Sequence, residues 1–220
     1  MIERRNEPRA FGGQRVGSDV ALVTLCRLTA CAIVLEGILA LYAPEARAAF
    51  EFGTVPKLPA LTNVAINGKS QIVNTTMTNF SVIDTRGTKS GWNITAQGQS
   101  GAGKSAVFAQ YCPKAKCAGQ SEGYIAGGAK MAAASLKLSS TGAKFSGGSG
   151  ATPTLQCAAA CNLDGAAAVK IASATTAEST WTTSGFSATS LALAVPTTLL
   201  ALPAEEIYRV NVLWTLATGP

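Results

Sequence analysis

The sequence has 220 residues, of which 14% are charged and 6% aromatic, and its formal net charge is +6 at neutral pH. That length accommodates one domain of sandwich size or two small ones. The lysines are scattered without a dense basic run, which argues against the basic stripe of a nucleic-acid-binding protein. Histidine, the commonest general base and metal ligand, is absent. The composition therefore favours a non-catalytic protein without cofactor or metal over an enzyme.

The first 48 residues have the order of a secretory signal. Residues 1–19 are polar and carry four arginines, an apolar stretch follows over 20–43, and Ala46-Arg47-Ala48 has the small-x-small pattern of a cleavage site. Arg27 and Glu36 interrupt the apolar stretch, and a charge near the centre of a span costs about 2.5–3.5 kcal/mol on insertion. This cost argues against the alternative, an uncleaved membrane anchor. We expect cleavage after Ala48 and a secreted product, extracellular or wall-associated, without a stable membrane span.

Residues 49–220 show the alternation of half-buried strands and no long helical pattern. Apolar and polar side chains alternate over residues 92–97, 136–138, 169–171 and 191–195. We expect a single domain of eight to ten short strands, an all-β antiparallel β-sandwich that is Ig-like or related. The alanine runs at 132–134 and 158–160 are the candidates for helical turns.

Two further stretches predict specific strand arrangements. Near the C-terminus, residues 207–216 are predicted to form one strand with Tyr208, Val210, Val212, Trp214 and Leu216 on one face. Near the start of the domain, Asn67-Gly68 favours a tight turn between strands at 62–66 and 70–77. We therefore expect an early hairpin, and a last strand that closes the core.

Residues 98–130 are rich in glycine, lysine and serine and are predicted to be an irregular excursion. Within them, residues 98–105 match the P-loop pattern G-x-x-x-x-G-K-[ST] completely. A working P-loop lies between a buried parallel strand and the start of a helix. Here the preceding strand is half polar, and the following stretch to Tyr111 is too short for such a helix. Nucleotide binding is therefore the least favoured function, and a Gly/Ser loop is the simpler interpretation.

Four cysteines follow the signal segment, in the patterns Cys112-x₄-Cys117 and Cys157-x₃-Cys161. Export favours disulfides over the alternative, a four-cysteine zinc site. Four cysteines allow three pairings. We favour the two local pairs because close spacing brings these thiols together first, while the cross-pairs stay open as alternatives.

The remaining polar and aromatic candidates do not form a catalytic pattern. The adjacent pair Glu205-Glu206 cannot flank one bond as a catalytic pair, because neighbouring side chains diverge. Asp84, Glu122, Asp164 and Glu178 are dispersed and are expected on the solvated surface. Trp181, between two threonines, is either one more core aromatic or an exposed contact for sugar or wall polymer.

Residues 84–95, with the sequence DTRGTKSGWNIT, and Trp214-Thr-Leu216 near the C-terminus resemble the two motifs of WxL-domain bacterial cell-surface proteins. Trp92-Asn-Ile94 has isoleucine where the family motif has leucine. The resemblance implies a secreted β domain that associates non-covalently with the cell wall, through peptidoglycan or another cell-envelope polymer. It makes Trp92, Ile94, Trp214 and Leu216 the candidate wall-binding residues. A structural or adhesive subunit that binds other surface proteins is the alternative.

Overall fold

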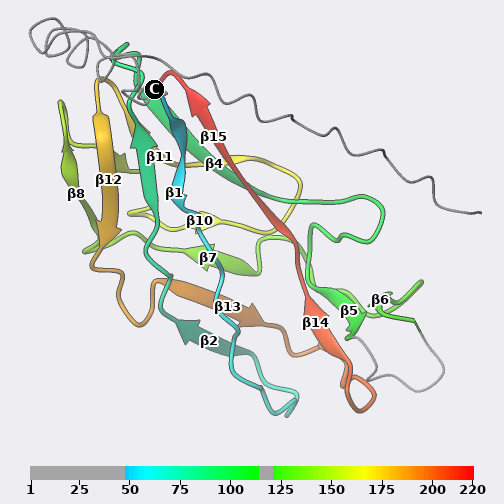
Figure 1. Cartoon of the computed structure of the whole chain (residues 1–220). Coiled ribbons are helices and arrows are strands. Elements are labelled where there is room, and N and C mark those ends of the chain that lie inside the picture. The colour runs from blue at the N-terminus through cyan, green and yellow to red at the C-terminus, as the bar shows by residue number, and fades with distance from the viewer. Residues whose placement is uncertain (1–47, 114–120) are drawn as a thin grey trace, which may run out of the picture. The chain divides into compact units, whose positions relative to one another are not determined.

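The computed structural model describes residues 48–113 and 121–220, which form strands and turns without a helix (Figure 1). The predicted signal segment, apart from Ala48, and Cys117 lie outside the described residues. The strands are β1 (Phe50–Thr54), β2 (Gln71–Thr75), β3 (Ser81–Asp84), β4 (Trp92–Gly98), β5 (Ala109–Cys112), β6 (Gly123–Tyr124), β7 (Leu136–Leu138), β8 (Lys144–Ser149), β9 (Thr154–Leu155), β10 (Cys161–Asn162), β11 (Val169–Ala174), β12 (Glu178–Ser184), β13 (Leu191–Val195), β14 (Ile207–Arg209) and β15 (Val212–Thr218). The all-β prediction is therefore confirmed, although the described residues hold fifteen strands rather than eight to ten.

The strands of the described residues form four sheets in which every pairing is antiparallel. The strand orders are β1-β3-β12-β8, β10-β7-β13-β2, β15-β4-β11-β9 and β14-β5-β6. We name these sheets by their inner strands: the β3/β12, β7/β13 and β4/β11 sheets, and the three-stranded β5 sheet. In Figure 1 the strands of the β7/β13 sheet run across the direction of β11 and β12.

One apolar core joins these sheets as in a β-sandwich. Trp92 on β4 packs edge-to-face on Phe145 of β8, with ring centroids 5.7 Å apart. Phe80, just before β3, lies 6.5 Å from Trp214 of β15. Leu138 of β7 belongs to the same buried cluster. Aromatic pairs of this kind add about 0.5–1.5 kcal/mol each beyond the area they bury, so they reinforce the apolar packing between the sheets.

The C-terminal stretch is two strands rather than one. β14 pairs with β5, whereas β15 pairs with β4, so the chain changes sheet at Val210-Asn211. The strand is interrupted at Asn211, whose N–H donates to Ser105 O (2.9 Å) and whose C=O accepts from Gln99 N (2.8 Å). The predicted alternation is nevertheless confirmed. The five apolar residues from Tyr208 to Leu216 on the predicted face are partly buried against the core.

The predicted hairpin around Asn67-Gly68 is wrong. Residues 62–66 lie outside any strand, and β2 pairs with β13, far along the chain. The turn itself exists, and the Asn67 side chain accepts the N–H of Lys69 (3.0 Å). β13 takes the partner position because its alternate leucines, such as Leu193 opposite Val73, complete the buried face of β2. A local turn signal therefore did not determine the strand pairing.

The glycine-rich excursion contains more order than predicted. Residues 101–104 form a tight turn closed by a bridge between Gly101 and Lys104, and no helix follows, so the P-loop geometry is not formed. β5 and β6 lie in the same stretch. The two alanine runs are turns rather than helices, since each contains a residue with positive φ, Ala134 at 65° and Ala160 at 59°.

Candidate functional site

The two motif segments lie side by side on β4 and β15. Ile94 pairs with Leu216, and Ala96 pairs with Trp214. Directly opposed residues of an antiparallel pair share a face, so all four candidate wall-binding residues point to the same side of the sheet. That side is the core. Trp92 and Ile94 are 0% exposed, whereas Trp214 and Leu216 remain partly exposed because β15 is the edge strand. Trp92 and Ile94 therefore cannot contact a polymer directly.

The opposite side of the same strands is polar. On β4 the alternate residues Asn93, Thr95 and Gln97 are partly exposed. Thr95 lies between Thr215 of β15 and Lys170 of β11, both exposed, in one row across three strands. The next row places Ser173 of β11 beside Asn93 and Thr154 of β9 beside Ser173. We call this surface the polar face, defined by Asn93, Thr95, Gln97, Thr154, Lys170, Ser173 and Thr215.

The polar face offers amides and hydroxyls, which both donate and accept hydrogen bonds, and one ammonium group. The sequence patterns did not identify these residues as one surface. The motif pattern could have identified two of these residues, because Asn93 and Thr215, the middle residues of the W-x-I and W-x-L motifs, belong to the polar face. The apolar residues of each motif hold the strand in the core, and the residue between them points outward.

The loop at 84–91, which precedes β4, is organised by an ion pair. The Asp84 carboxylate accepts from Arg86 Nε (2.8 Å) and Nη2 (2.7 Å), and it also accepts the Arg86 backbone N–H (3.2 Å). These hydrogen bonds hold the pKa of Asp84 below its usual value, although burial opposes the shift. The guanidinium also lies 3.7 Å from the centre of the Phe50 ring, a cation–π geometry. The prediction that Asp84 is solvated is wrong, since this residue is 3% exposed.

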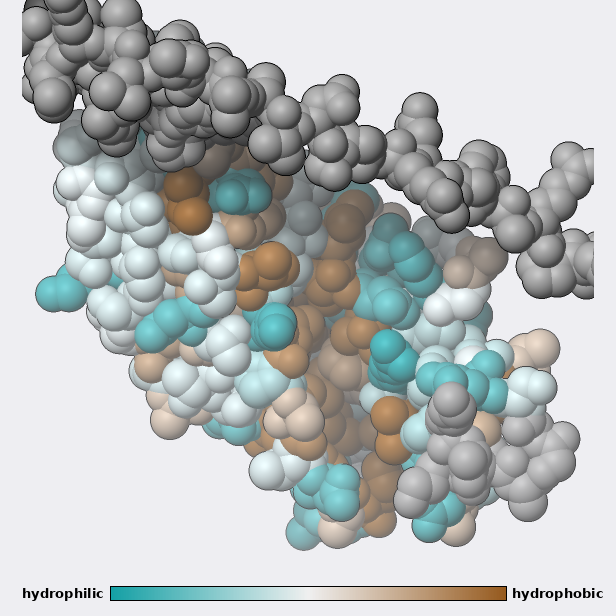
Figure 2. All heavy atoms as spheres, in the orientation of Figure 1, coloured by the Kyte–Doolittle hydropathy of each residue, from teal (hydrophilic) through white to brown (hydrophobic). Residues whose placement is uncertain are grey.

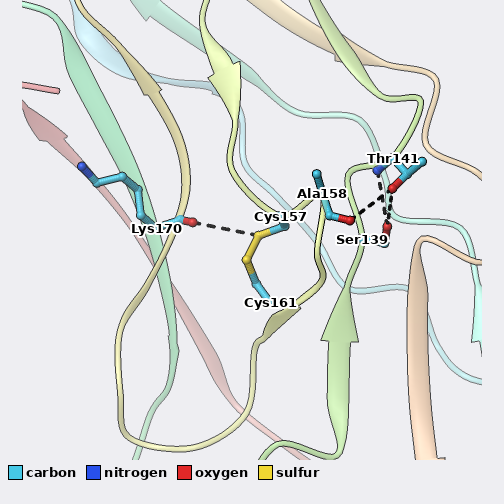
Figure 3. Close-up of a disulfide and its surroundings, with 6 residues drawn as sticks. All are labelled: Ser139, Thr141, Cys157, Ala158, Cys161 and Lys170. Carbon is cyan, nitrogen blue, oxygen red and sulfur yellow. Dashed lines mark hydrogen bonds between the residues drawn. A yellow bond between two sulfur atoms is a disulfide. The ribbon is translucent and has the colours of Figure 1, made fainter.

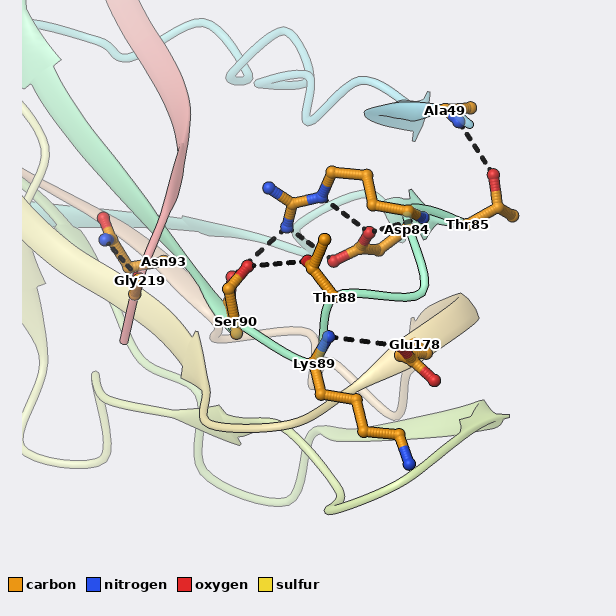
Figure 4. Close-up of polar contacts among 11 residues, drawn as sticks. Ala49, Asp84, Thr85, Thr88, Lys89, Ser90, Asn93, Glu178 and Gly219 are labelled. Carbon is orange, nitrogen blue, oxygen red and sulfur yellow. Dashed lines mark hydrogen bonds and ion pairs between the residues drawn. The ribbon is translucent and has the colours of Figure 1, made fainter. Parts of the chain in front are cut away.

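Further hydrogen bonds attach the loop to its surroundings (Figure 4). Thr85 exchanges two bonds with Ala49, and Lys89 N donates to Glu178 Oε1 (3.3 Å). Next to β4, Asn93 Nδ2 donates to Gly219 O (2.7 Å), which holds the end of β15 against the start of β4. The polar residues of the 84–91 segment thus have a structural role in placing both motif strands.

Position 91 requires glycine, because the loop leaves no room there for a side chain. Its φ is +68°, and an added Cβ would lie 2.2 Å from Ala174 O. Its carbonyl accepts from Gly219 N (3.2 Å) and from Arg86 Nη2 (3.3 Å). Glycine at this position therefore allows the loop to approach the end of β11 closely.

Two other sequence predictions concern buried residues. Trp181 is a core residue, 5% exposed, so its interpretation as an exposed contact is wrong. Asp164, predicted on the surface, is 4% exposed and accepts the N–H groups of Ser135 (3.1 Å) and Leu136 (2.8 Å). Burial raises the pKa of Asp164, and these N–H donors oppose that shift. The sequence around Asp164 carries no pattern that reveals this distant pairing.

The local disulfide Cys157–Cys161 is present, as predicted (Figure 3). Cys157 is fully buried, and its sulfur lies 3.9 Å from Lys170 O at the start of β11. Thr141 Oγ1 donates to Ala158 O inside the disulfide loop (3.3 Å). Cys112 is also disulfide-bonded. The Cys157–Cys161 bridge fixes a turn beside β11, one strand of the polar face.

The described residues contain no helix long and apolar enough to cross a membrane. Within the same residues, no three His, Cys, Asp or Glu side chains gather as they would around a metal ion. No protein-family model, curated protein or solved structure gives a significant match to the chain.

Proposed function

We propose that this protein is an exported, non-catalytic surface protein that associates non-covalently with the bacterial cell wall through the polar face. The observation that carries the proposal is the pairing of the two motif segments on β4 and β15. Their apolar side chains point into or against the core, and their intervening residues, Asn93 and Thr215, belong to the polar face, on which Leu213 opposite Gln97 is the one exposed large apolar side chain among the described residues. Peptidoglycan, or another cell-envelope polymer, is the proposed ligand.

The chemistry of the polar face suits a repeating polymer of sugars and peptides. Such a polymer presents hydroxyls, amides and carboxylates, each of which can pair with a hydroxyl, an amide or the Lys170 ammonium. A single hydrogen bond contributes only about 0.5–1.5 kcal/mol net. Strands about 4.8 Å apart, with side chains on one face about 6.8 Å apart along each strand, provide a regular array. Binding would therefore arise from several weak contacts to successive units.

Sedimentation of the protein with purified insoluble peptidoglycan tests this proposal. The test variant is the triple substitution Thr95→Ala, Gln97→Ala and Thr215→Ala, which removes polar groups from the polar face without touching the core. The matched control is Thr180→Ala with Thr182→Ala on β12, which removes two exposed hydroxyls from a different sheet. Three lost hydrogen bonds predict at least about 10-fold weaker retention for the test variant. Retention unchanged by the triple substitution would refute the assignment of the polar face.

A further inference from the structure

A cleft of about 930 Å³ opens between one end of β13, the segment 58–66 and the chain around β14. Its size lies near the upper end of ligand sites, which are commonly 300–1,000 Å³. Leu193 and Val195 of β13 line it from the core side, and Leu58, Leu61, Val64 and Leu199 line the other walls. The cleft is thus an apolar extension of the core that no described segment fills.

The mouth of the cleft is also apolar. Ile66, Leu200 and Ile207 are 41%, 63% and 47% exposed, and all three line the cleft. They account for half of the six large hydrophobic side chains that are exposed in the described part of the chain. Figure 2 shows hydrophobic residues gathered in a band down the middle of one face, between more polar regions. Clustered apolar exposure of this kind marks interaction sites.

One wall of the cleft has unpaired backbone. Among the described residues, the backbone C=O groups of residues 58–64 and their N–H groups, which Pro59 lacks, make no hydrogen bond, although Lys57 and Ala65 on either side do. Residues 62–66 have strand-forming alternation, yet they pair with no strand in the part of the chain that the structure describes. Backbone groups left open next to an apolar groove are what strand addition by an extended peptide requires. An acyl chain could fill the groove but could not use these groups.

One end of the cleft carries two carboxylates and one guanidinium. Glu122 accepts from Tyr111 Oη (2.9 Å), and Glu206 accepts from Gln110 Nε2, so neutral donors hold both side chains. Arg209 lies over the Tyr111 ring, 4.5 Å from its centre. In the described part of the chain, three charged side chains line the cleft and sum to −1, which favours a basic group in the ligand over a fatty acid or phospholipid.

We propose that the cleft binds an extended segment of another polypeptide by strand addition. The backbone of that segment pairs with residues 61–64, its alternate apolar side chains enter the cleft, and a lysine or arginine lies beside Glu122 and Glu206. This site is separate from the polar face and does not depend on polymer binding. It would let the protein hold the wall with one surface and a second protein with another.

A displayed library of random ten-residue peptides, selected on the full-length protein, supplies the probe. We expect selected peptides to carry aliphatic residues at alternate positions and at least one basic residue. Affinities of the synthetic peptides are then measured by calorimetry for Thr62→Pro and Asn63→Pro, each of which removes one backbone N–H. Successive N–H groups of an extended segment point in opposite directions, so one of the two substitutions should weaken binding about 10-fold. Thr62→Ala and Asn63→Ala keep the N–H and serve as matched controls.

The variant Glu206→Gln tests the charged end, because it keeps a hydrogen-bonding group and removes one negative charge. We expect this substitution to lower the affinity for peptides with a basic residue by about 3- to 10-fold and to leave the affinity for neutral peptides unchanged. The proposal is overturned if no peptide with aliphatic residues at alternate positions is selected, or if the proline and alanine substitutions change peptide affinity equally. It is also overturned if palmitate binds the cleft while peptides do not. All four backbone-test variants change exposed residues outside strands, so circular dichroism should show an unaltered fold.

Discussion

Breaking the ion pair between Asp84 and Arg86 should destabilise the whole β4–β15 pairing. In Asp84→Ala, the guanidinium loses two charge-assisted hydrogen bonds and the loop loses the bond from the Arg86 backbone N–H. Removing one partner of a fully buried pair costs about 3–5 kcal/mol. The Arg86 side chain retains 17% exposure and its contacts with Gly91 O and the Phe50 ring. We therefore expect a smaller loss, about 2–3 kcal/mol in the free energy of unfolding.

Urea unfolding followed by tryptophan fluorescence measures this loss. A change of 2–3 kcal/mol corresponds to a fall in Tm of about 5–10 °C for a domain of this size. The double variant Asp84→Ala with Arg86→Ala separates the pair from its surroundings, and we expect a coupling energy of at least about 1 kcal/mol. Lys144→Ala, at an exposed position on β8, is the control and should change stability by less than about 0.5 kcal/mol. A loss below 0.5 kcal/mol for Asp84→Ala, or additive single effects, would refute the structural role of this pair.

The same pair predicts a pH dependence. The hydrogen bonds from Arg86 lower the pKa of Asp84 below 3.8 in the folded state. A lowered pKa means that the stabilisation is fully present above the unfolded-state pKa and is lost as the pH falls through the folded-state pKa. The difference in unfolding free energy between the wild type and Asp84→Ala should therefore stay constant from pH 7 to about pH 5 and shrink below about pH 4. A difference that grows on acidification would contradict the assignment.

Three further outcomes follow from buried or closely packed groups. Because burial raises the pKa of Asp164, the stability of the wild type relative to Asp164→Asn should decrease as the pH rises from about 4 to 7, measured by urea unfolding. Replacing Cys157 and Cys161 by alanine should lower the free energy of unfolding by about 2 kcal/mol, the loop-entropy value for so short a loop, and should lower the urea midpoint. Gly148→Ala would place a Cβ 2.1 Å from the Trp181 ring and should cost over about 2 kcal/mol, whereas Gly127→Ala, with open space around it, should cost about 1 kcal/mol in thermal unfolding.

The polar face shows how far residue patterns lead toward a site. Alternation at residues 92–97 and 212–216 was enough to sort the side chains of each strand into two sets. It did not reveal that these two strands are neighbours, or that Lys170 and Ser173 of β11 extend the surface on the other side of β4. Sheet pairing depends on backbone hydrogen bonds between distant segments, which no short stretch of sequence records. The motif residues were therefore found from sequence, but the surface they help to build was not.

The amino-acid sequence alone determined the all-β class and the buried side of the C-terminal strands, and it favoured the local pairing of Cys157 with Cys161, because each depends on near neighbours in the chain. Tertiary structure alone decided that Trp181 is inside, that Asp84 and Asp164 are buried, and that residues 62–66 lack a strand partner among the described residues. The physical reason is that burial and pairing are properties of what packs opposite a residue. For these residues the packing partners come from distant parts of the chain.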